Sequence, residues 1–118
     1  MGKHNETGIK GEHIASSFLL KKGYEILHTN WKAGNKEVDI IAFKDEMVVF
    51  AEVKTRRNYD FGFPEEAVTV KKQLHIKSVA EAFFELNKTY TNLRFDIISV
   101  LLKGNEVVEI LHFEDAFY

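Results

Sequence analysis

The sequence predicts a single α/β domain, a sandwich in which a mixed β-sheet of about five strands is flanked by helices. Two segments place apolar residues three and four positions apart, as an amphipathic helix does. Five others have the apolar runs and bounding turn residues of strands. The 118 residues include one proline and no linker-like or repeated stretch, so residues 1–118 are expected to form one domain around one core. The predicted element order is α-β-β-β-α-β-β.

The first helix is predicted over residues 7–22, and Gly23 follows it at the position of a C-capping glycine. Its apolar positions at helical spacing are Ile14, Ala15, Phe18 and Leu19. On a helical projection Gly8 and Gly11 share the face of these residues, and Glu12 lies at its edge. Two glycines on a buried face predict a close approach of this helix to the sheet.

Three strands are predicted next, over residues 24–31, 37–43 and 47–54. The polar residues Lys44, Asp45 and Glu46 separate the last two strands, which are therefore expected to form a hairpin.

A loop over residues 55–64 precedes a second helix, for which Thr69 is the predicted N-cap. Its apolar stripe extends to Leu86 and includes an unexpected lysine, Lys72, in the first turn. Strands over residues 93–102 and 107–113 then form a second hairpin, with a turn at residues 103–106.

Composition restricts the chemistry that is available. The chain has no cysteine, which excludes disulfides, thiolate nucleophiles and cysteine-ligated metals. The N-terminus is polar and no stretch approaches the roughly 18 apolar residues of a membrane span, so a cytoplasmic protein without a membrane partner is expected. The net charge of -2 argues weakly against a nucleic-acid partner. However, residues 35–53 alone carry -3, and the segments on either side of this acidic block are basic.

Three residues in the predicted hairpin carry chemistry. Glu52 and Lys54 are two positions apart in one strand, so their side chains are expected on the same face. Asp39 interrupts the apolar run of the preceding strand, where an unpaired carboxylate is costly to bury. Folding the hairpin about Asp45 brings Asp39 and Glu52 onto adjacent strands. This arrangement predicts a two-carboxylate site for a divalent cation.

The residue types match a hard cation such as Mg²⁺ or Mn²⁺, which prefers oxygen ligands and retains water. Asp39, Glu52 and the backbone carbonyl of Val53 are the predicted ligands, with a substrate phosphate completing the shell. Lys54 beside the cation is expected to orient or deprotonate an attacking water. The alternative is a structural Glu–Lys ion pair on an exposed strand face, because an acid-x-lysine triplet is short enough to arise by chance.

Six motifs appear in order along nearly the whole chain, from about Gly8 to Phe117. They are Gly11-Glu12, residues 23–30 (GYEILHTN), residues 37–41 (EVDII), residues 50–56 (FAEVKTR), residues 61–64 (FGFP) and residues 94–96 (RFD). Together they resemble the YraN-like family of small bacterial proteins. That family is assigned to the PD-(D/E)xK nuclease superfamily, whose core is similar to that of archaeal Holliday-junction resolvases.

The resemblance implies a restriction-endonuclease-like fold and four catalytic positions. Glu12 matches the helix acid, Asp39 the strand acid, and Glu52 with Lys54 the acid-x-lysine pair. The chain departs from the pattern at Val38, which replaces the proline that names the superfamily, at Lys36, which replaces a glycine, and at His13, which replaces an aspartate. None of these departures removes a ligand.

Further residues are candidates for nucleic-acid contact. They are Arg56 and Arg57 after the acid-x-lysine strand, and Lys71, Lys72 and Gln73 at the start of the second helix, where amides and the helix dipole favour a phosphate. A snorkelling surface lysine is the alternative for Lys72. Phe61 and Phe63 are expected to anchor their loop. Arg94 and Asp96 are expected to pair, and the histidines to be surface or rim residues.

The leading hypothesis is a Mg²⁺- or Mn²⁺-dependent endonuclease that hydrolyses DNA, branched or damaged, by direct attack of water. The alternative is a nucleic-acid-binding or protein-interaction module that retains the fold without turnover. A carboxylate-pair glycosidase fits less well, because Lys54 has no role in it. A homodimer is one arrangement that the sequence leaves open.

Overall fold

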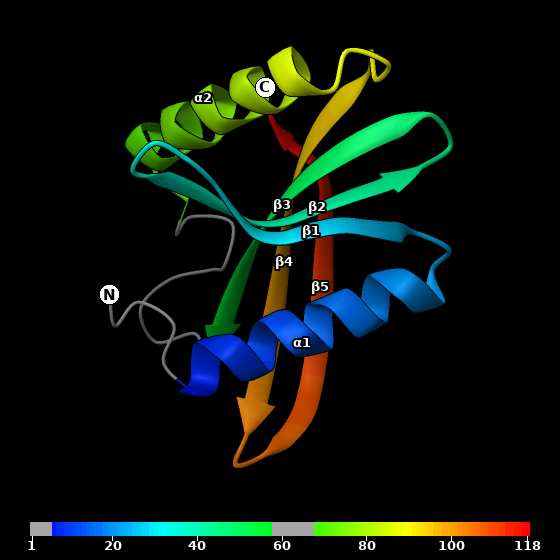
Figure 1. The fold of residues 1–118 in the computed structure, drawn as a ribbon. Coiled ribbons are helices and arrows are strands. Elements are labelled where there is room, and N and C mark those ends of the chain that lie inside the picture. The colour runs from blue at the N-terminus through cyan, green and yellow to red at the C-terminus, as the bar shows by residue number, and fades with distance from the viewer. Residues whose placement is uncertain (1–5, 58–67) are drawn as a thin grey trace.

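The computed structural model describes residues 6–57 and 68–118, which form two helices and five strands (Figure 1). In chain order the elements are α1 (Glu6–Lys21), β1 (Glu25–Ala33), β2 (Lys36–Lys44), β3 (Met47–Arg56), α2 (Val70–Leu86), β4 (Leu93–Lys103) and β5 (Glu106–Phe117). The predicted element order is confirmed. Within the described ranges, neither helix combines the length and the apolar character needed to cross a membrane.

The five strands form one mixed sheet in the order β1-β2-β3-β4-β5. β3 and β4 are parallel, and α2 makes the crossover between them, whereas the other neighbours are antiparallel. A parallel pair needs such a crossover because a tight turn can join only antiparallel strands.

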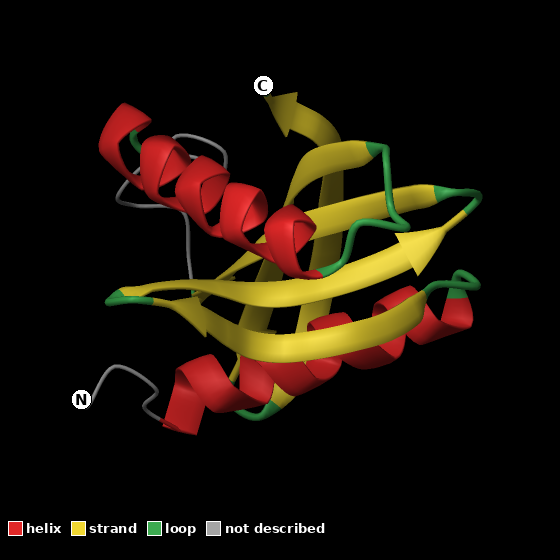
Figure 2. Ribbon diagram, turned by 45° about the horizontal axis from the view of Figure 1, so that its top comes forward, coloured by secondary structure: helices red, strands yellow, loops and turns green. Residues whose placement is uncertain are grey.

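The helices cover opposite faces of the sheet (Figure 2). Ala15 and Leu19 of α1 belong to one cluster of buried side chains, and Ile76 and Phe83 of α2 belong to another. The expectation of one shared core is therefore wrong: the sheet separates two apolar layers, since alternate side chains of its central strands point to opposite faces. Full burial of a side chain as large as Leu19, Ile76 or Phe83 contributes about 1.5–3 kcal/mol to folding.

Gly11 provides the predicted close approach of α1 to the sheet. It is buried, and a Cβ atom at this position would overlap Thr55 Oγ1 and lie 2.9 Å from Thr55 Cβ. Helix α1 therefore lies against the end of β3 at a separation that only glycine permits, and this brings the first turns of α1 close to the hairpin of β2 and β3.

The predicted β2–β3 hairpin turns at Asp45 and Glu46, which both have left-handed backbone angles (φ 52° and 64°), as a two-residue type I′ turn requires. The ladder runs from Lys44–Met47 to Ile40–Ala51 and ends there. The next positions along this register are Asp39 and Glu52, so the two acids stand opposite each other where the strands stop pairing.

Strand β5 continues four residues beyond the predicted end. A register shift lies between Phe95 and Ile97 of β4, opposite a bulge in β5 where Asp115 has a φ of 54°. The bulge breaks the alternation of side chains by which the strand would be recognised from sequence.

Candidate functional site

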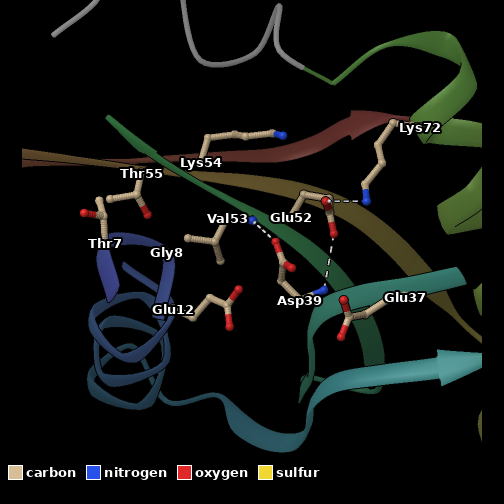
Figure 3. Close-up of a pocket in the computed structure, with 10 residues that line it drawn as sticks. All are labelled: Thr7, Gly8, Glu12, Glu37, Asp39, Glu52, Val53, Lys54, Thr55 and Lys72. Atoms are coloured by element: carbon tan, nitrogen blue, oxygen red, sulfur yellow. Dashed lines mark hydrogen bonds and ion pairs between the residues drawn. The ribbon is translucent and has the colours of Figure 1, made fainter. Parts of the chain in front are cut away.

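A cavity of about 440 Å³ opens where α1, β2, β3 and α2 converge (Figure 3). Its lining residues are Thr7, Gly8, Glu12, Glu37, Asp39, Glu52, Val53, Lys54, Thr55 and Lys72. All four residues predicted as catalytic are among them, together with Val53 and Lys72. The structure thus brings together acids from three separate elements.

Asp39 and Glu52 are joined by a reciprocal pair of hydrogen bonds. The backbone N–H of Val53 donates to Asp39 Oδ2 at 2.8 Å, and the backbone N–H of Asp39 donates to Glu52 Oε2 at 3.2 Å. Because the β2–β3 ladder has ended, the two carboxylates satisfy strand amides that would otherwise lack a partner. Both side chains are thereby held at the cavity (Figure 3).

Burial, and for Asp39 the proximity of other acids, makes the ionisation of the two carboxyl groups unfavourable. Burial, followed by the charges of Glu52 and Glu12, raises the pKa of Asp39 from 3.8 to about 8, against the hydrogen bond from Val53. Burial also raises the pKa of Glu52, whose side chain is 3% exposed, although Lys72 and Lys54 oppose this rise. The site therefore favours the binding of a proton or another cation.

Lys72 supplies part of that positive charge. Its Nζ lies 3.4 Å from Glu52 Oε1, reaching across from the first turn of α2 (Figure 3). The predicted N-cap at Thr69 is confirmed, since Thr69 Oγ1 accepts from the backbone N–H of Lys72 at 3.2 Å. The lysine that stood out on the apolar stripe of this helix is thus turned toward the carboxylates.

Glu12 and Lys54 complete the predicted set. Glu12 comes from α1 and projects toward Asp39 (Figure 3), and its charge contributes to the raised pKa of Asp39. Lys54 lies along the cavity two residues beyond Glu52, close enough for its charge to lower the Glu52 pKa. The acid-x-lysine pair of β3 therefore faces one cavity, as the period of the strand predicts.

The donor set fits a hard divalent cation. Two neighbouring carboxylates whose charges are poorly compensated provide oxygen ligands, and Mg²⁺ commonly uses one or two carboxylates and fills its remaining positions with water and phosphate oxygens. Within the described residues no group of three or more histidine, aspartate or glutamate side chains is arranged to enclose a metal. Asp39 and Glu52 would hold the ion, with Val53 at the same edge of the cavity.

The other predicted nucleic-acid contacts do not line this cavity. Arg57 donates to the carbonyl oxygen of Gly104 at 2.8 Å, and Gln73 Nε2 donates to the carbonyl oxygen of Val68 at 3.1 Å, at the start of its own helix. Lys71 is exposed, and Arg56 keeps a buried Nε without a partner in the described part of the chain. The predicted anchors Phe61 and Phe63 lie outside the described residues.

Sequence reasoning missed four lining residues, Glu37, Thr7, Gly8 and Thr55. Glu37 lies two positions before Asp39, so the period of the strand could have identified it. Nothing in the sequence marks the two threonines, because they reach the cavity only through the seating of α1 against β3.

A second polar network lies between β4 and β5, away from the cavity. Arg94 pairs with Asp96 at 2.8 Å, as predicted. His112 Nε2 lies 2.7 Å from Asp96 Oδ2, and its side chain is 4% exposed, so the prediction of surface or rim histidines is wrong for this residue. Burial raises the pKa of Asp96, but the hydrogen bonds from His112, Arg94 and Asp115 outweigh it and leave this pKa below its usual value.

Comparison with known proteins identifies relatives along the full chain. A protein of Caldicellulosiruptor bescii described as "UPF0102 protein" is 47% identical over 115 residues, which span 95% of this chain and 97% of that relative. "UPF0102 protein FP2501" of Flavobacterium psychrophilum is 47% identical over 119 residues, spanning 100% and 98%. Among solved structures, SfsA of Pyrococcus furiosus in complex with Ca²⁺ aligns at a TM-score of 0.32 and 14% identity, and the alignment covers 90% of this chain and 62% of that one.

The profile of the family described as "Uncharacterised protein family UPF0102" matches residues 11–100, a range that contains Glu12, Asp39, Glu52 and Lys54. The chain therefore belongs to the UPF0102 family, the YraN-like family that its ordered motifs predict.

Proposed function

We propose that this protein is a divalent-metal-dependent endonuclease that hydrolyses phosphodiester bonds in DNA. The observation that carries the proposal is the pairing of Asp39 with Glu52 at the open end of the β2–β3 ladder, in a cavity that also holds Lys54 and Lys72. Two carboxylates that resist ionisation bind a divalent cation, and two lysines beside them bind a phosphate.

The residues of the site divide the chemistry between them. Asp39 and Glu52 bind Mg²⁺ or Mn²⁺, and the carbonyl of Val53 is assigned as a further ligand. When bound, the cation stabilises negative charge on the phosphoryl oxygens. Lys54 orients the attacking water, whose proton passes to the surrounding solvent, and Glu12 holds a second water on the side of α1. No covalent intermediate is needed, and the chain has no cysteine to form one through a thiolate.

The arrangement supports assignment to the PD-(D/E)xK superfamily. A helix acid (Glu12), a strand acid (Asp39) and an acid-x-lysine pair (Glu52 and Lys54) line one cavity, in the order that the superfamily motif requires. The substrate is assigned as DNA, branched or damaged. Arg56, Arg57 and Lys71 remain candidates for contacts to the flanking phosphates.

The contact between Lys72 and Glu52 favours one alternative, a module that binds nucleic acid without cleaving it. An ammonium group 3.4 Å from Glu52 Oε1 already compensates part of the site's negative charge. In such a protein Lys72 would remain there permanently and no divalent ion would be needed.

Metal-dependent cleavage distinguishes the two functions. The wild-type protein is incubated with forked, four-way and single-stranded DNA while Mg²⁺ or Mn²⁺ is titrated, and cleavage is followed on denaturing gels. Asp39→Asn and Lys54→Met are expected to lower the cleavage rate at least about 100-fold, the order of effect expected when a general base or charge-stabilising group is lost.

Matched controls make the same chemical changes on exposed turns. Asp45→Asn in the β2–β3 turn and Lys103→Met beside the β4–β5 turn should cleave at the wild-type rate. If wild type and Asp39→Asn cleave equally, the observed activity does not belong to this site. Metal-independent DNA binding without cleavage would favour the binding module.

A further inference from the structure

A second cavity lies between α1 and β1, beside the carboxylate site. It has a volume of about 320 Å³ and is lined by Ile9, Glu12, His13, Ser16, Thr29 and Asn30. Glu12 lines both cavities, so the two cavities are neighbours. Adjacent nucleotides of one strand can therefore occupy them. The volume falls within the range of about 300–1,000 Å³ that is typical of small-ligand pockets.

Asn30 gives this cavity its polar character. Its backbone is left-handed, with a φ of 51°, although the register of β1 with β2 continues unchanged from Thr29 to Trp31. Asparagine tolerates this conformation better than most residues. The side-chain oxygen Oδ1 is buried and has no hydrogen-bond partner in the described part of the chain. A buried acceptor of this kind is costly unless a donor from outside the protein reaches it.

The remaining lining residues suit a flat heterocycle. His13 and Ile9 are exposed on α1 and present a ring and an aliphatic side chain, which are surfaces on which a nucleobase stacks. Ser16 and Thr29 add hydroxyl groups that donate or accept. A stacking surface combined with an unpartnered amide oxygen is the combination that recognises the edge of a base.

We infer that this cavity is a subsite for one unpaired nucleobase of the DNA strand whose phosphate occupies the carboxylate site. The inference rests on the proposed function and names the part of the substrate next to the reacting group. Asn30 Oδ1 requires an N–H donor, and its amide N–H₂ group donates to an acceptor beside it. An unpaired base of any kind has an N–H donor next to an acceptor on its exposed edge and satisfies both groups, whereas an abasic unit satisfies neither.

The test measures binding separately from cleavage. Forked DNA carrying a fluorescent label and a single adenine, cytosine, thymine or abasic unit at successive positions of one arm is titrated with the Lys54→Met protein in Mg²⁺, and affinity is read from anisotropy. At one position next to the cleaved phosphodiester, forks that carry a base should bind about tenfold more tightly than the abasic fork, the scale of a stacked and hydrogen-bonded base.

Variants of the lining residues assign the effect to this cavity. Asn30→Gly keeps the left-handed backbone and should reduce the preference for a base over the abasic unit, whereas Asn105→Gly, the same change in the exposed β4–β5 turn, should retain it. His13→Ala, at an exposed helix position that tolerates alanine, should weaken binding of every base-bearing fork about fivefold and leave the abasic fork unchanged.

Equal affinity for all four forks, or discrimination that persists in both Asn30→Gly and His13→Ala, would overturn the inference. Competition by free deoxyadenosine monophosphate as effective as that by the adenine fork would overturn it as well, by assigning the cavity to a free nucleotide. Failure of the proposed function has a different signature, because the wild-type protein would then cleave none of the forks whatever base they carried.

Discussion

Asp39 and Glu52 perform two tasks with the same carboxylate groups. Each accepts a hydrogen bond from a backbone amide at the open end of the β2–β3 ladder, and each faces a cavity where its charge is incompletely compensated. The hydrogen bonds fix the carboxylates in position, and the shortage of positive charge gives them affinity for a cation. Without metal, the free energy of unfolding is therefore expected to be lower than it would be if these two charges were fully compensated.

The raised pKa of Asp39 predicts how stability depends on pH. The pKa is about 8 in the folded protein and near its ordinary value of 3.8 in the unfolded chain, so between these values the folded state holds the extra proton. The contribution of Asp39 is therefore fully present below about pH 4 and is lost as pH rises through about 8. Urea unfolding should show a free energy of unfolding lower by ~2–4 kcal/mol at pH 8.5 than at pH 5.5 without divalent ions.

Asp39→Asn should flatten this dependence, since the amide cannot ionise but still offers an oxygen to the Val53 amide. Mn²⁺ should stabilise the wild-type protein at pH 8.5 and leave Asp39→Asn unchanged. Asp45→Asn should behave as the wild type does. An unchanged pH slope in Asp39→Asn would show that another group titrates.

Lys72 predicts a competition between lysine and metal at Glu52. Because its Nζ lies 3.4 Å from Glu52 Oε1, a bound divalent ion has to displace it or share that carboxylate. Lys72→Met should therefore strengthen Mn²⁺ binding about threefold to tenfold in calorimetric titrations without DNA, which corresponds to ~1 kcal/mol for a partly exposed pair. Lys71→Met, at the exposed neighbouring position, should change Mn²⁺ affinity much less. Weaker Mn²⁺ binding in Lys72→Met would instead make Lys72 a support of the metal site.

At the scale of elements, the seating of α1 decides whether Glu12 reaches the other acids. Gly11 lies against Thr55 of β3 with no room for a Cβ atom. An alanine within a helix ordinarily adds ~0.5–1 kcal/mol of stability relative to glycine, whereas overpacking costs about 1–3 kcal/mol. Because of the contact with β3, replacing Gly11 by alanine is expected to destabilise the protein, although the same change would stabilise an isolated helix.

Gly11→Ala should lower the free energy of unfolding by ~1–3 kcal/mol in urea titrations and also reduce cleavage, because it shifts α1 and with it Glu12. Thr55→Ala removes the side-chain oxygen that the new methyl group would overlap. In the Gly11→Ala background it should recover part of the lost stability. Additive effects of the two substitutions would place the strain elsewhere.

The hydrogen bonds around Asp96 join β5 to β4. Asp96 accepts from Arg94, from His112 and from the backbone N–H of Asp115 at the β5 bulge. Since these bonds lower the pKa of Asp96, its contribution to stability is present above the ordinary value of 3.8 and is lost as pH falls through the folded value. The bulge in β5 thus depends on a carboxylate that remains ionised.

Asp96→Asn should cost about 2–4 kcal/mol at pH 7, because it removes the close charged partner of Arg94 and leaves only Glu114, at 3.9 Å, and the cost should shrink below pH 4. Asp115→Asn is the matched change at an exposed position, where asparagine tolerates the left-handed backbone, and should cost less than about 0.5 kcal/mol. Chemical denaturation at pH 7 and pH 3 measures both variants. A loss in Asp96→Asn that stays constant across this range would contradict the charged role of the carboxylate.

At the scale of the whole molecule, the distribution of charge predicts how DNA binding responds to metal and salt. The net charge is -2, and residues 35–53, which contain Asp39 and Glu52, carry -3. DNA binding should therefore be weak in a chelator and strengthen at least about tenfold with Mg²⁺ in anisotropy titrations, as compensation of the acids removes repulsion of the phosphates. Replacing a lysine that contacts a phosphate should reduce, by about one, the slope of the logarithm of the binding constant against the logarithm of the salt concentration. Equally tight binding in the chelator would contradict a metal-bridged complex.

The element order and the Asp39–Glu52 pairing were predictable because they depend on local information. The apolar periods identify the helices and strands, and a turn centred on residues 45 and 46 makes Asp39 the partner of Glu52 by counting alone. The β5 extension and the burial of His112 were not predictable, since the bulge in β5 and the His112 ring both contact Asp96, sixteen or more residues away in the chain.

The sequence by itself determined which residue types the chemistry uses and which strands carry them, because the alternation of a strand and the length of a hairpin are short-range properties. Only the tertiary structure decided that Glu12 from α1 and Lys72 from α2 reach the same cavity, that Glu37, Thr7 and Thr55 line it, and that Arg57 and Gln73 turn away. The two helices cover opposite faces of the sheet, so their first turns meet at its open end only through the packing of both apolar layers.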